Sequence, residues 1–266
     1  MIPRANITAW RSNDQLEQNL VISRALVSMF NHQVVADRLL FRGGTALHKL
    51  FFGVGSRYSE DIDLVQRDAG PIGAIIKGIR EAVDSWLGSP IWKQGHGRFT
   101  LYYRFETSFA PISVRRLKVE IHTREHFAVL APTRRSFSVE NPWFTGTAAL
   151  TTYQLDELLA TKLRALYQRS KGRDLYDLWL ALEKATPDPE RVIECFQRYM
   201  DHEGAAVSRA EFEANLAAKL AGAAFLQDTR LMVPPEAQYD PITAARVVMD
   251  GLIAYLPGKP WKGFAV

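Results

Sequence analysis

A change in the spacing of apolar residues near Leu150 limits what this chain can fold into more than any other feature of its sequence. Before that point, several short segments alternate apolar and polar residues, which is typical of strands with one buried face. After it, apolar residues recur mainly at helical spacing. The pattern predicts an α/β core with a small mixed sheet over residues 1–150, including an N-terminal helix, and a helical domain over residues 151–266.

The same patterns divide each half into elements. In the first half they predict helices over residues 12–31, 45–53 and 72–88, and strands over residues 37–42, 57–67, 98–107 and 115–123. In the second half they predict helices over residues 153–169, 174–185, 189–200, 208–220 and 241–256. Ser12 with Gln15, and Ser208 with Glu211, have the spacing of helix capping boxes.

Composition narrows the class of protein. Cys195 is the only cysteine among 266 residues, which excludes an intrachain disulfide and predicts a buried, inert thiol in a reducing cytoplasm. The N-terminus lacks the apolar core of a signal peptide, and no stretch approaches the roughly 18 apolar residues of a membrane helix. We therefore expect a cytoplasmic protein without a membrane partner.

The net charge of +4 is mild, but basic residues cluster locally. The clusters are Arg115-Arg116-Lys118, Arg134-Arg135 and the segment from Arg164 to Arg173. Such clusters could bind phosphate groups, and solvated side chains scattered over a surface are the alternative for each of them.

Asp61 and Asp63 are two residues apart on a predicted strand, so both side chains leave the same face of the sheet. Repulsion between two carboxylates raises the pKa of one of them unless a cation lies between them. Oxygen ligands of this kind suit Mg²⁺, or Mn²⁺ in its place. The alternative is a pair of solvated aspartates at the end of a strand.

Just upstream, Gly43-Gly44-Thr45 forms a predicted turn that opens a helix. Glycines let the backbone approach a ligand closely, and the free N–H groups of a helix start favour an anion such as a triphosphate. A tight turn without a ligand is the alternative.

Glu120 is a third carboxylate. On its predicted strand Leu117, Val119 and Ile121 face the core, while Glu120 faces the other side with Lys118 and His122. Glu120 could meet Asp61 and Asp63 across the sheet, where it would hold metal or accept a proton. A solvent-facing glutamate is the alternative. We expect no zinc site at His122 and His126, because they straddle a strand end and lack a Glu-x-x-His pattern.

Lys162 occupies a position of its predicted helix where the pattern calls for an apolar residue, which indicates an anionic partner or a side chain that snorkels to the surface. Farther along, Asp174 and Asp177 have the spacing of a helix N-cap and its N3 residue, and a functional role for them is the alternative.

Taken in order, four segments resemble the AbiEii/AbiGii-type nucleotidyltransferase toxins, a bacterial branch of the polymerase-β-like superfamily. The segments are FRGGTALHK, RYSEDIDL, KVEI and LLATKLRALYQRSKGRDLYDLW, and together they span about residues 38 to 182. The resemblance implies a polymerase-β-like nucleotidyltransferase core, with the helical domain completing the active-site cleft.

The resemblance also implies roles for single residues. It implies that the nucleotide and its metal are held by Gly43, Gly44, Ser59, Asp61 and Asp63. Lys162 matches the helix lysine that contacts the nucleotide, and either Asp174 or Asp177 matches a downstream functional aspartate. Many relatives in the superfamily have Asp where this chain has Glu120. Thr45 and Arg57 complete the expected nucleotide-binding set.

The implied activity is transfer of a nucleoside monophosphate from an NTP to an RNA acceptor, with the 3′ end of tRNA as the expected site and a block of translation as the result. The implied partner is an antitoxin, with or without a stable complex. Three alternatives stay open: transfer to a protein hydroxyl, phosphotransfer from the γ position, and a non-catalytic GTP-binding module.

Overall fold

The computed structural model describes residues 12–53 and 56–263, and contacts along the chain divide it into two units, Met1–Tyr153 and Gln154–Val266. Residues 1–11 of the predicted core and 264–266 of the predicted helical domain lie outside the described residues. Each unit is described by itself below.

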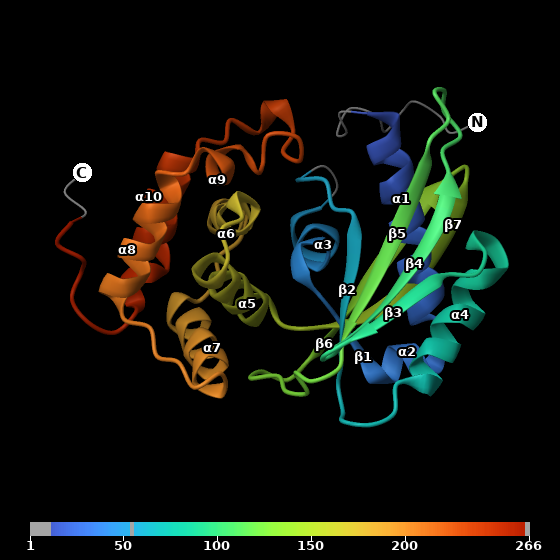
Figure 1. The fold of residues 1–266 in the computed structure, drawn as a ribbon, viewed down its shortest axis with the longest axis horizontal. Helices are drawn as coiled ribbons and strands as arrows, with labels where there is room; N and C mark the ends of the chain where they lie inside the picture. Colours follow the sequence, from blue (N-terminus) through green and yellow to red (C-terminus); the bar gives the residue numbers. More distant parts are fainter. Residues whose placement is uncertain (1–11, 54–55, 264–266) are drawn as a thin grey trace. The chain divides into compact units, whose positions relative to one another are not determined.

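The first unit is built on a seven-stranded sheet with the order β3-β4-β5-β2-β1-β7-β6 (Figure 1). The strands are β1 (Leu39–Arg42), β2 (Asp61–Gln66), β3 (Ile91–Gly95), β4 (Arg98–Glu106), β5 (Val114–His122), β6 (Thr133–Asn141) and β7 (Phe144–Thr152). Strands β2 and β5 pair in parallel, as do β1 and β7, whereas the other neighbours are antiparallel. The sheet is therefore mixed, and the predicted α/β class is confirmed.

Helices cover the two faces of this sheet differently. Helices α1 (Asn13–Phe30), α2 (Gln33–Arg38) and α4 (Gly73–Leu87) lie on one side, and α3 (Gly43–Leu47) lies on the other (Figure 1). Helix α3 continues into η2 (His48–Phe52), a single π-helical segment of the kind often found at functional sites. Ser12 caps α1 by accepting a hydrogen bond from the Gln15 backbone N–H at 3.3 Å, as its spacing predicts.

The core of the first unit lies between the sheet and helices α1 and α4. Phe41 and Leu64 of the sheet are fully buried, and the Phe41 ring lies 6.3 Å from that of Phe30 on α1. On the same side, the Tyr103 hydroxyl donates to Asp84 of α4 at 3.0 Å. This packing leaves the opposite face of β2 and β5 for polar side chains.

The sequence predicted only four of the seven strands. Strands β3 and β6 were missed because they lack a buried face that would produce alternation: all five residues of β3 are exposed, and Val139 is the one buried residue of β6. Strand β7 was missed because Gly146 and two alanines weaken its pattern.

The second unit contains helices only, within the part of the chain that the structure describes. They are α5 (Leu155–Gln168), α6 (Gly172–Lys184), α7 (Pro189–His202), α8 (Arg209–Leu220), α9 (Ala223–Gln227) and α10 (Pro241–Gly251), with the 3₁₀ turns η3 (Pro235–Ala237) and η4 (Ile253–Tyr255). Its core contains Phe196 and Phe212, whose rings lie 5.9 Å apart. The capping box of Ser208 and Glu211 is confirmed at the start of α8.

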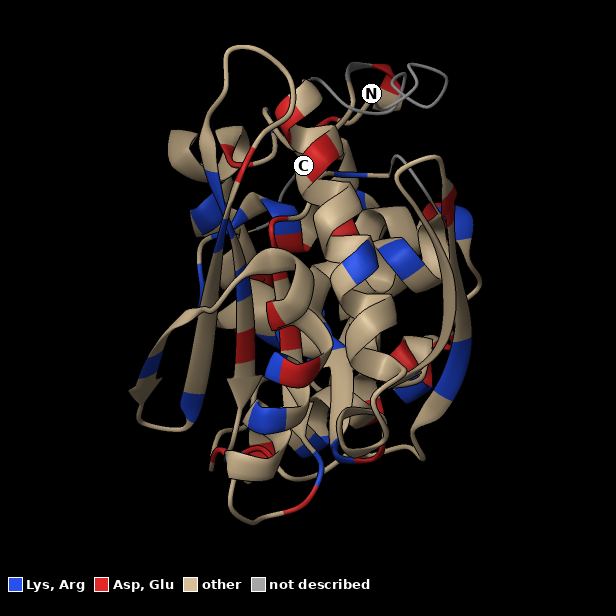
Figure 2. Ribbon diagram, turned by 90° about the vertical axis from the view of Figure 1, so that its right-hand side faces the viewer, with Lys and Arg blue, Asp and Glu red and all other residues tan. Residues whose placement is uncertain are grey.

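Charged residues of both signs are interspersed along helices and strands (Figure 2). Each predicted basic cluster is partly neutralised: Arg115 pairs with Asp14, Arg134 with Asp37 at 3.4 Å, and Arg164 with Glu203 at 3.2 Å. Among the described residues, no helix is long and apolar enough to cross a membrane.

Candidate active site

Strands β2 and β5 bring the predicted carboxylates together. Alternation buries Ile62 and Leu64 completely and leaves Asp61 and Asp63 on the other face of β2. The parallel pairing then sets Lys118 beside Asp61 and Glu120 beside Asp63. The expectation that Glu120 faces away from the core is confirmed.

His122 joins two of these carboxylates. One ligand atom each from Asp63, Glu120 and His122 lie within 4.8 Å of one another, and all three side chains are half-buried. This set of two oxygens and one nitrogen fits a divalent cation, since manganese and magnesium accept carboxylate oxygens and imidazole suits several other transition metals. Asp61 lies outside this group of three and is linked to it through Lys118, whose Nζ is 3.6 Å from Asp61 Oδ2 and 3.0 Å from Glu120 Oε2.

The carboxylates differ in their electrostatic environments. Burial raises the pKa of Asp61 to about 6, and the neighbouring Asp63, Glu60 and Glu120 add to this effect against the opposing charge of Lys118. Hydrogen bonding with His122 and Lys118 lowers the pKa of Glu120 to about 2, although burial acts in the other direction. Glu120 is therefore held ionised, whereas Asp61 has a cost of ionisation that a bound cation would remove.

The glycine turn is packed directly against Asp63. Gly43 has φ +79°, and a Cβ atom at this position would lie 2.6 Å from Asp63 Oδ2. Glycine is favoured by the positive φ at this position, and any side chain here would displace the Asp63 carboxylate. The Thr45 hydroxyl donates to the Asp61 carbonyl at 2.7 Å, which fixes the start of α3 against β2. Among the residues that the structure describes, the side chain of the N-cap residue Arg42 accepts no hydrogen bond from the first N–H groups of this helix.

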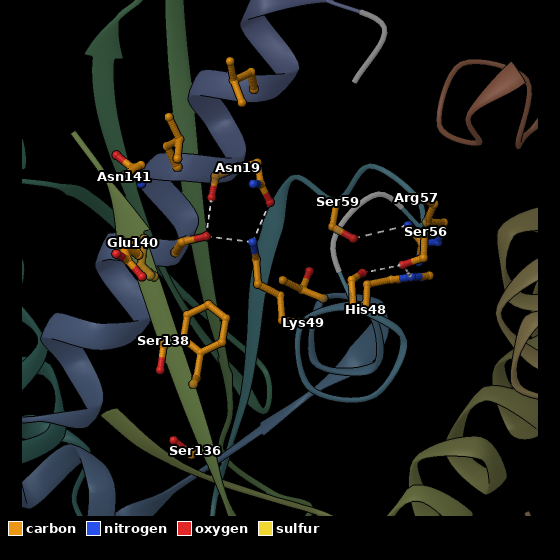
Figure 3. Close-up of a pocket in the computed structure, with 17 residues that line it drawn as sticks. Asn19, His48, Lys49, Ser56, Arg57, Ser59, Ser136, Ser138, Glu140 and Asn141 are labelled. Atoms are coloured by element: carbon orange, nitrogen blue, oxygen red, sulfur yellow. Dashed lines mark hydrogen bonds between the residues drawn. The ribbon is translucent and has the colours of Figure 1, made fainter. Parts of the chain in front are cut away.

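A cavity of about 320 Å³ within the first unit reaches this turn at Thr45, whereas the two glycines and the three carboxylates do not line it. Figure 3 shows Lys49 pointing toward Asn19, with Arg57 and Ser59 on another wall and Ser138 on the strand side. Three predicted nucleotide-binding residues, Thr45, Arg57 and Ser59, line it. Arg57 is buried, and its Nη1 donates to the Tyr58 carbonyl at 2.9 Å and to Ser59 Oγ at 3.4 Å.

Lys49 is the unexpected residue of this cavity. Its Nζ donates to Asn19 Oδ1 at 2.5 Å and to Ser23 Oγ at 2.8 Å, and it has no carboxylate partner among the described residues. Burial lowers the pKa of Lys49 to about 7. A cation that is desolvated without a counterion is suited to an anionic ligand.

In the second unit, Lys162 of α5 lies between two buried aspartates of α6. Its Nζ is 3.0 Å from Asp174 Oδ1 and 2.8 Å from Asp177 Oδ2, and both carboxylates are fully buried. Arg169 also pairs with Asp174, Nε to Oδ2, at 2.7 Å. Although burial would raise the pKa of Asp174, Lys162 and Arg169 hold it below its usual value.

These contacts decide two alternatives. Lys162 is only 5% exposed, so it does not snorkel to the surface. The N-cap of α6 is Lys171, so the interpretation of Asp174 as an N-cap is wrong. Within this unit, Lys162 has anionic partners, as its position in the helix predicted, and they are Asp174 and Asp177.

Comparisons with known proteins identify the family of this chain. Residues 24–245 match the sequence model of a family described as nucleotidyl transferase AbiEii toxin, type IV toxin–antitoxin system. The chain belongs to the AbiEii nucleotidyltransferase toxin family. The resemblance seen in the sequence is thereby confirmed. The protein is a nucleotidyltransferase toxin of a type IV toxin–antitoxin system. The family implies an antitoxin and a nucleotide as its partners.

Solved structures show the same fold as this AbiEii family member. JHP933 from Helicobacter pylori is 20% identical with a TM-score of 0.56, and the match covers 91% of this chain and 92% of that one. MenT4, a nucleotidyltransferase toxin from Mycobacterium tuberculosis, is 19% identical with a TM-score of 0.56, and the match covers 93% of this chain and 96% of that one. A search of curated protein sequences gives no match.

Sequence reasoning missed two residues of the site in this AbiEii protein. The sequence placed His122 on the same face of β5 as Glu120 but did not predict it as a metal ligand. Lys49 gave no signal, because its cavity is formed by α1, η2 and β6, and β6 was not predicted.

Proposed function

We propose that the protein transfers a nucleoside monophosphate from an NTP to the 3′ end of an RNA, with tRNA as the acceptor, in a reaction that depends on Mg²⁺ or Mn²⁺ and blocks translation. The observation that carries the proposal is the contact of the Gly43 turn with Asp63, on the same sheet face as Asp61 and Glu120. This contact would place a backbone that can bind phosphate next to carboxylates that can bind a metal ion. Phosphoryl transfer requires both, because the phosphates must be positioned and their charge neutralised.

In this proposal Asp61, Asp63 and Glu120 hold the metal. Asp63 and Glu120 already lie with His122 in one group of ligand atoms, and Asp61, on the same face of β2, would complete the set. When bound, a divalent cation neutralises charge on the α-phosphate and on the leaving pyrophosphate. The low pKa of Glu120 favours a role as a ligand over a role as a proton acceptor, because a general base works best with a pKa near the working pH.

The nucleotide is proposed to lie along the turn and its cavity. The backbone of Gly43 and Gly44 would receive phosphate oxygens, and Lys49 and Arg57 would offset their charge. Thr45 and Ser59 line the same space and would donate hydrogen bonds. Lys162 is proposed to contact the nucleotide as well, with Asp174 and Asp177 as the groups that position its ammonium.

The experiment supplies α-labelled or γ-labelled NTPs in parallel, together with total tRNA or total cellular protein and Mg²⁺. The proposal predicts that label from the α position enters tRNA and that label from the γ position does not. Label in protein would indicate a protein hydroxyl as acceptor, label only from the γ position would indicate phosphotransfer, and retained nucleotide without any transfer would indicate a binding module. Asp63→Asn should abolish transfer, and the exposed Asp68→Asn is the matched control.

A further inference from the structure

The sheet face that carries the carboxylates extends beyond them across three strands. Because residues paired across strands share a face, the register places Tyr102 and Arg104 of β4 beside Lys118 and Arg116 of β5. The same register places Ile91 and Lys93 of β3 beside Tyr102 and Thr100. We call this surface the β3–β5 face; its residues are Ile91, Lys93, Arg98, Thr100, Tyr102, Arg104 and Arg116.

The β3–β5 face carries more positive than negative charge, because the same alternation places Lys93, Arg98, Arg104, Arg116 and Lys118 on it together with the carboxylates of Glu106 and Glu120. Lys93, Arg104 and Arg116 are exposed, and none has a carboxylate partner among the described residues. Arg98 alone has such a contact, at 3.8 Å from Glu120. Arg104 and Arg116 are directly opposite each other, an arrangement of like charges that destabilises a sheet. An anionic ligand would relieve this repulsion.

An aromatic side chain lies among these cations. The Arg116 guanidinium lies over the Tyr102 ring, 4.6 Å from its centre, and the neighbouring Ile91 is 54% exposed. Many proteins that bind single-stranded nucleic acid combine aromatic rings, on which bases stack, with basic side chains that contact the phosphates. An acidic protein surface would use the cations but would have less use for the ring.

The order of the strands separates this face from the nucleotide turn. In the order β3-β4-β5-β2-β1, the Gly43 turn follows β1 on one side of Asp63, and Glu120 on β5 lies on the other side. Arg116 lies four residues before Glu120 on β5, roughly 13 Å away at the rise of a strand. If the donor nucleotide binds at the turn, the β5 side of the carboxylates stays open for the acceptor.

We propose that the β3–β5 face binds the single-stranded 3′ end of the acceptor RNA and leads its terminal hydroxyl to Glu120 and Asp63. The proposal rests on the proposed function, since it assumes that the acceptor is RNA. Tyr102 stacks a base, and Lys93, Arg104 and Arg116 contact the phosphates that precede the reacting end.

The test compares two triple variants in the full chain. Lys93→Ala/Arg104→Ala/Arg116→Ala removes three cations that have no carboxylate partner among the described residues. Lys77→Ala/Arg80→Ala/Arg67→Ala makes the same change in net charge outside the β3–β5 face and is the control. Binding of fluorescent tRNA is measured by anisotropy over a range of salt concentrations. We expect the first variant to bind at least about tenfold more weakly, with a slope of log K against log salt smaller by about 2, and the control to bind like wild type.

Measuring KM for RNA and for NTP separately distinguishes the loss of base stacking on Tyr102 from general damage to the fold. Tyr102→Ala should raise the KM for RNA about tenfold and leave the KM for NTP unchanged, while Tyr102→Phe keeps the ring and should behave like wild type. Equal binding by the two triple variants, or an equal rise in both KM values for Tyr102→Ala, would overturn the face proposal. If wild type transfers no α-label to RNA, the proposed function itself fails. If wild type does transfer α-label to RNA and the Lys93/Arg104/Arg116 variant has the wild-type KM for RNA, only the proposal for the β3–β5 face fails.

Discussion

Replacing Gly43 with alanine should separate catalysis from stability. The new Cβ atom would lie 2.6 Å from Asp63 Oδ2, and ordinary contact begins near 3.4 Å, so the carboxylate must move by about 0.8 Å. Misplacement of about 1 Å in a catalytic group can lower the rate about a hundredfold. The left-handed backbone at this position, φ +79°, adds a cost of about 1–3 kcal/mol to folding.

Gly88→Ala is the matched control, because Gly88 also has φ +79° but a Cβ atom added there would have nothing within 4 Å. Both variants should lose about 1–3 kcal/mol of unfolding free energy in urea denaturation, because both positions have positive φ. Only Gly43→Ala should lose about a hundredfold in kcat for incorporation of α-labelled nucleotide into RNA. If the two variants were equally active, the contact between the turn and Asp63 would have no catalytic meaning.

Three further predictions test other parts of the site. Chelation with EDTA should abolish transfer, and Mg²⁺ or Mn²⁺ should restore it in wild type but not in Asp63→Asn. Lys49→Met should raise the KM for NTP about tenfold, yet stabilise the fold by up to about 2 kcal/mol below pH 7 in urea denaturation. That gain should shrink as the pH rises toward 10.5, since the folded wild type releases the Lys49 proton near pH 7 and the unfolded chain keeps it to about 10.5. Lys162→Ala should cost about 3 kcal/mol of unfolding free energy, because it leaves two buried carboxylates without their shared cation.

Each of these has an outcome that contradicts it. Transfer activity that survives chelation with EDTA would show that the reaction does not depend on a divalent cation. A stability difference between wild type and Lys49→Met that did not change with pH would mean that Lys49 is not desolvated in the folded protein. A loss below about 1 kcal/mol for Lys162→Ala would mean that the buried ion pairs contribute little.

The sequence was most informative where one face of an element is buried. The alternation of Leu117, Val119 and Ile121 predicted β5 and the orientation of Glu120, because these three residues are fully buried. The same logic failed for β6, because Val139 is the one buried residue among its nine.

Contacts between elements that are distant in the sequence could not be predicted from periodicity, for a different reason. The meeting of His122 with Asp63 depends on the parallel pairing of β2 with β5, and periodicity within a strand does not specify its neighbour. Lys162 and Asp174 each stood out in the sequence, but their pairing depends on how α5 packs on α6. The cavity around Lys49 likewise required three elements that are far apart in the chain.

Mass spectrometry of tRNA 3′ ends tests the central claim most directly. Purified tRNA is incubated with Mg²⁺, each NTP in turn, and either wild type, Asp63→Asn or Asp68→Asn. The account predicts that wild type and Asp68→Asn add the mass of one or more nucleoside monophosphates to the 3′ end with at least one NTP, and that Asp63→Asn adds none. Unchanged tRNA with every NTP, or equal extension by Asp63→Asn, would contradict it.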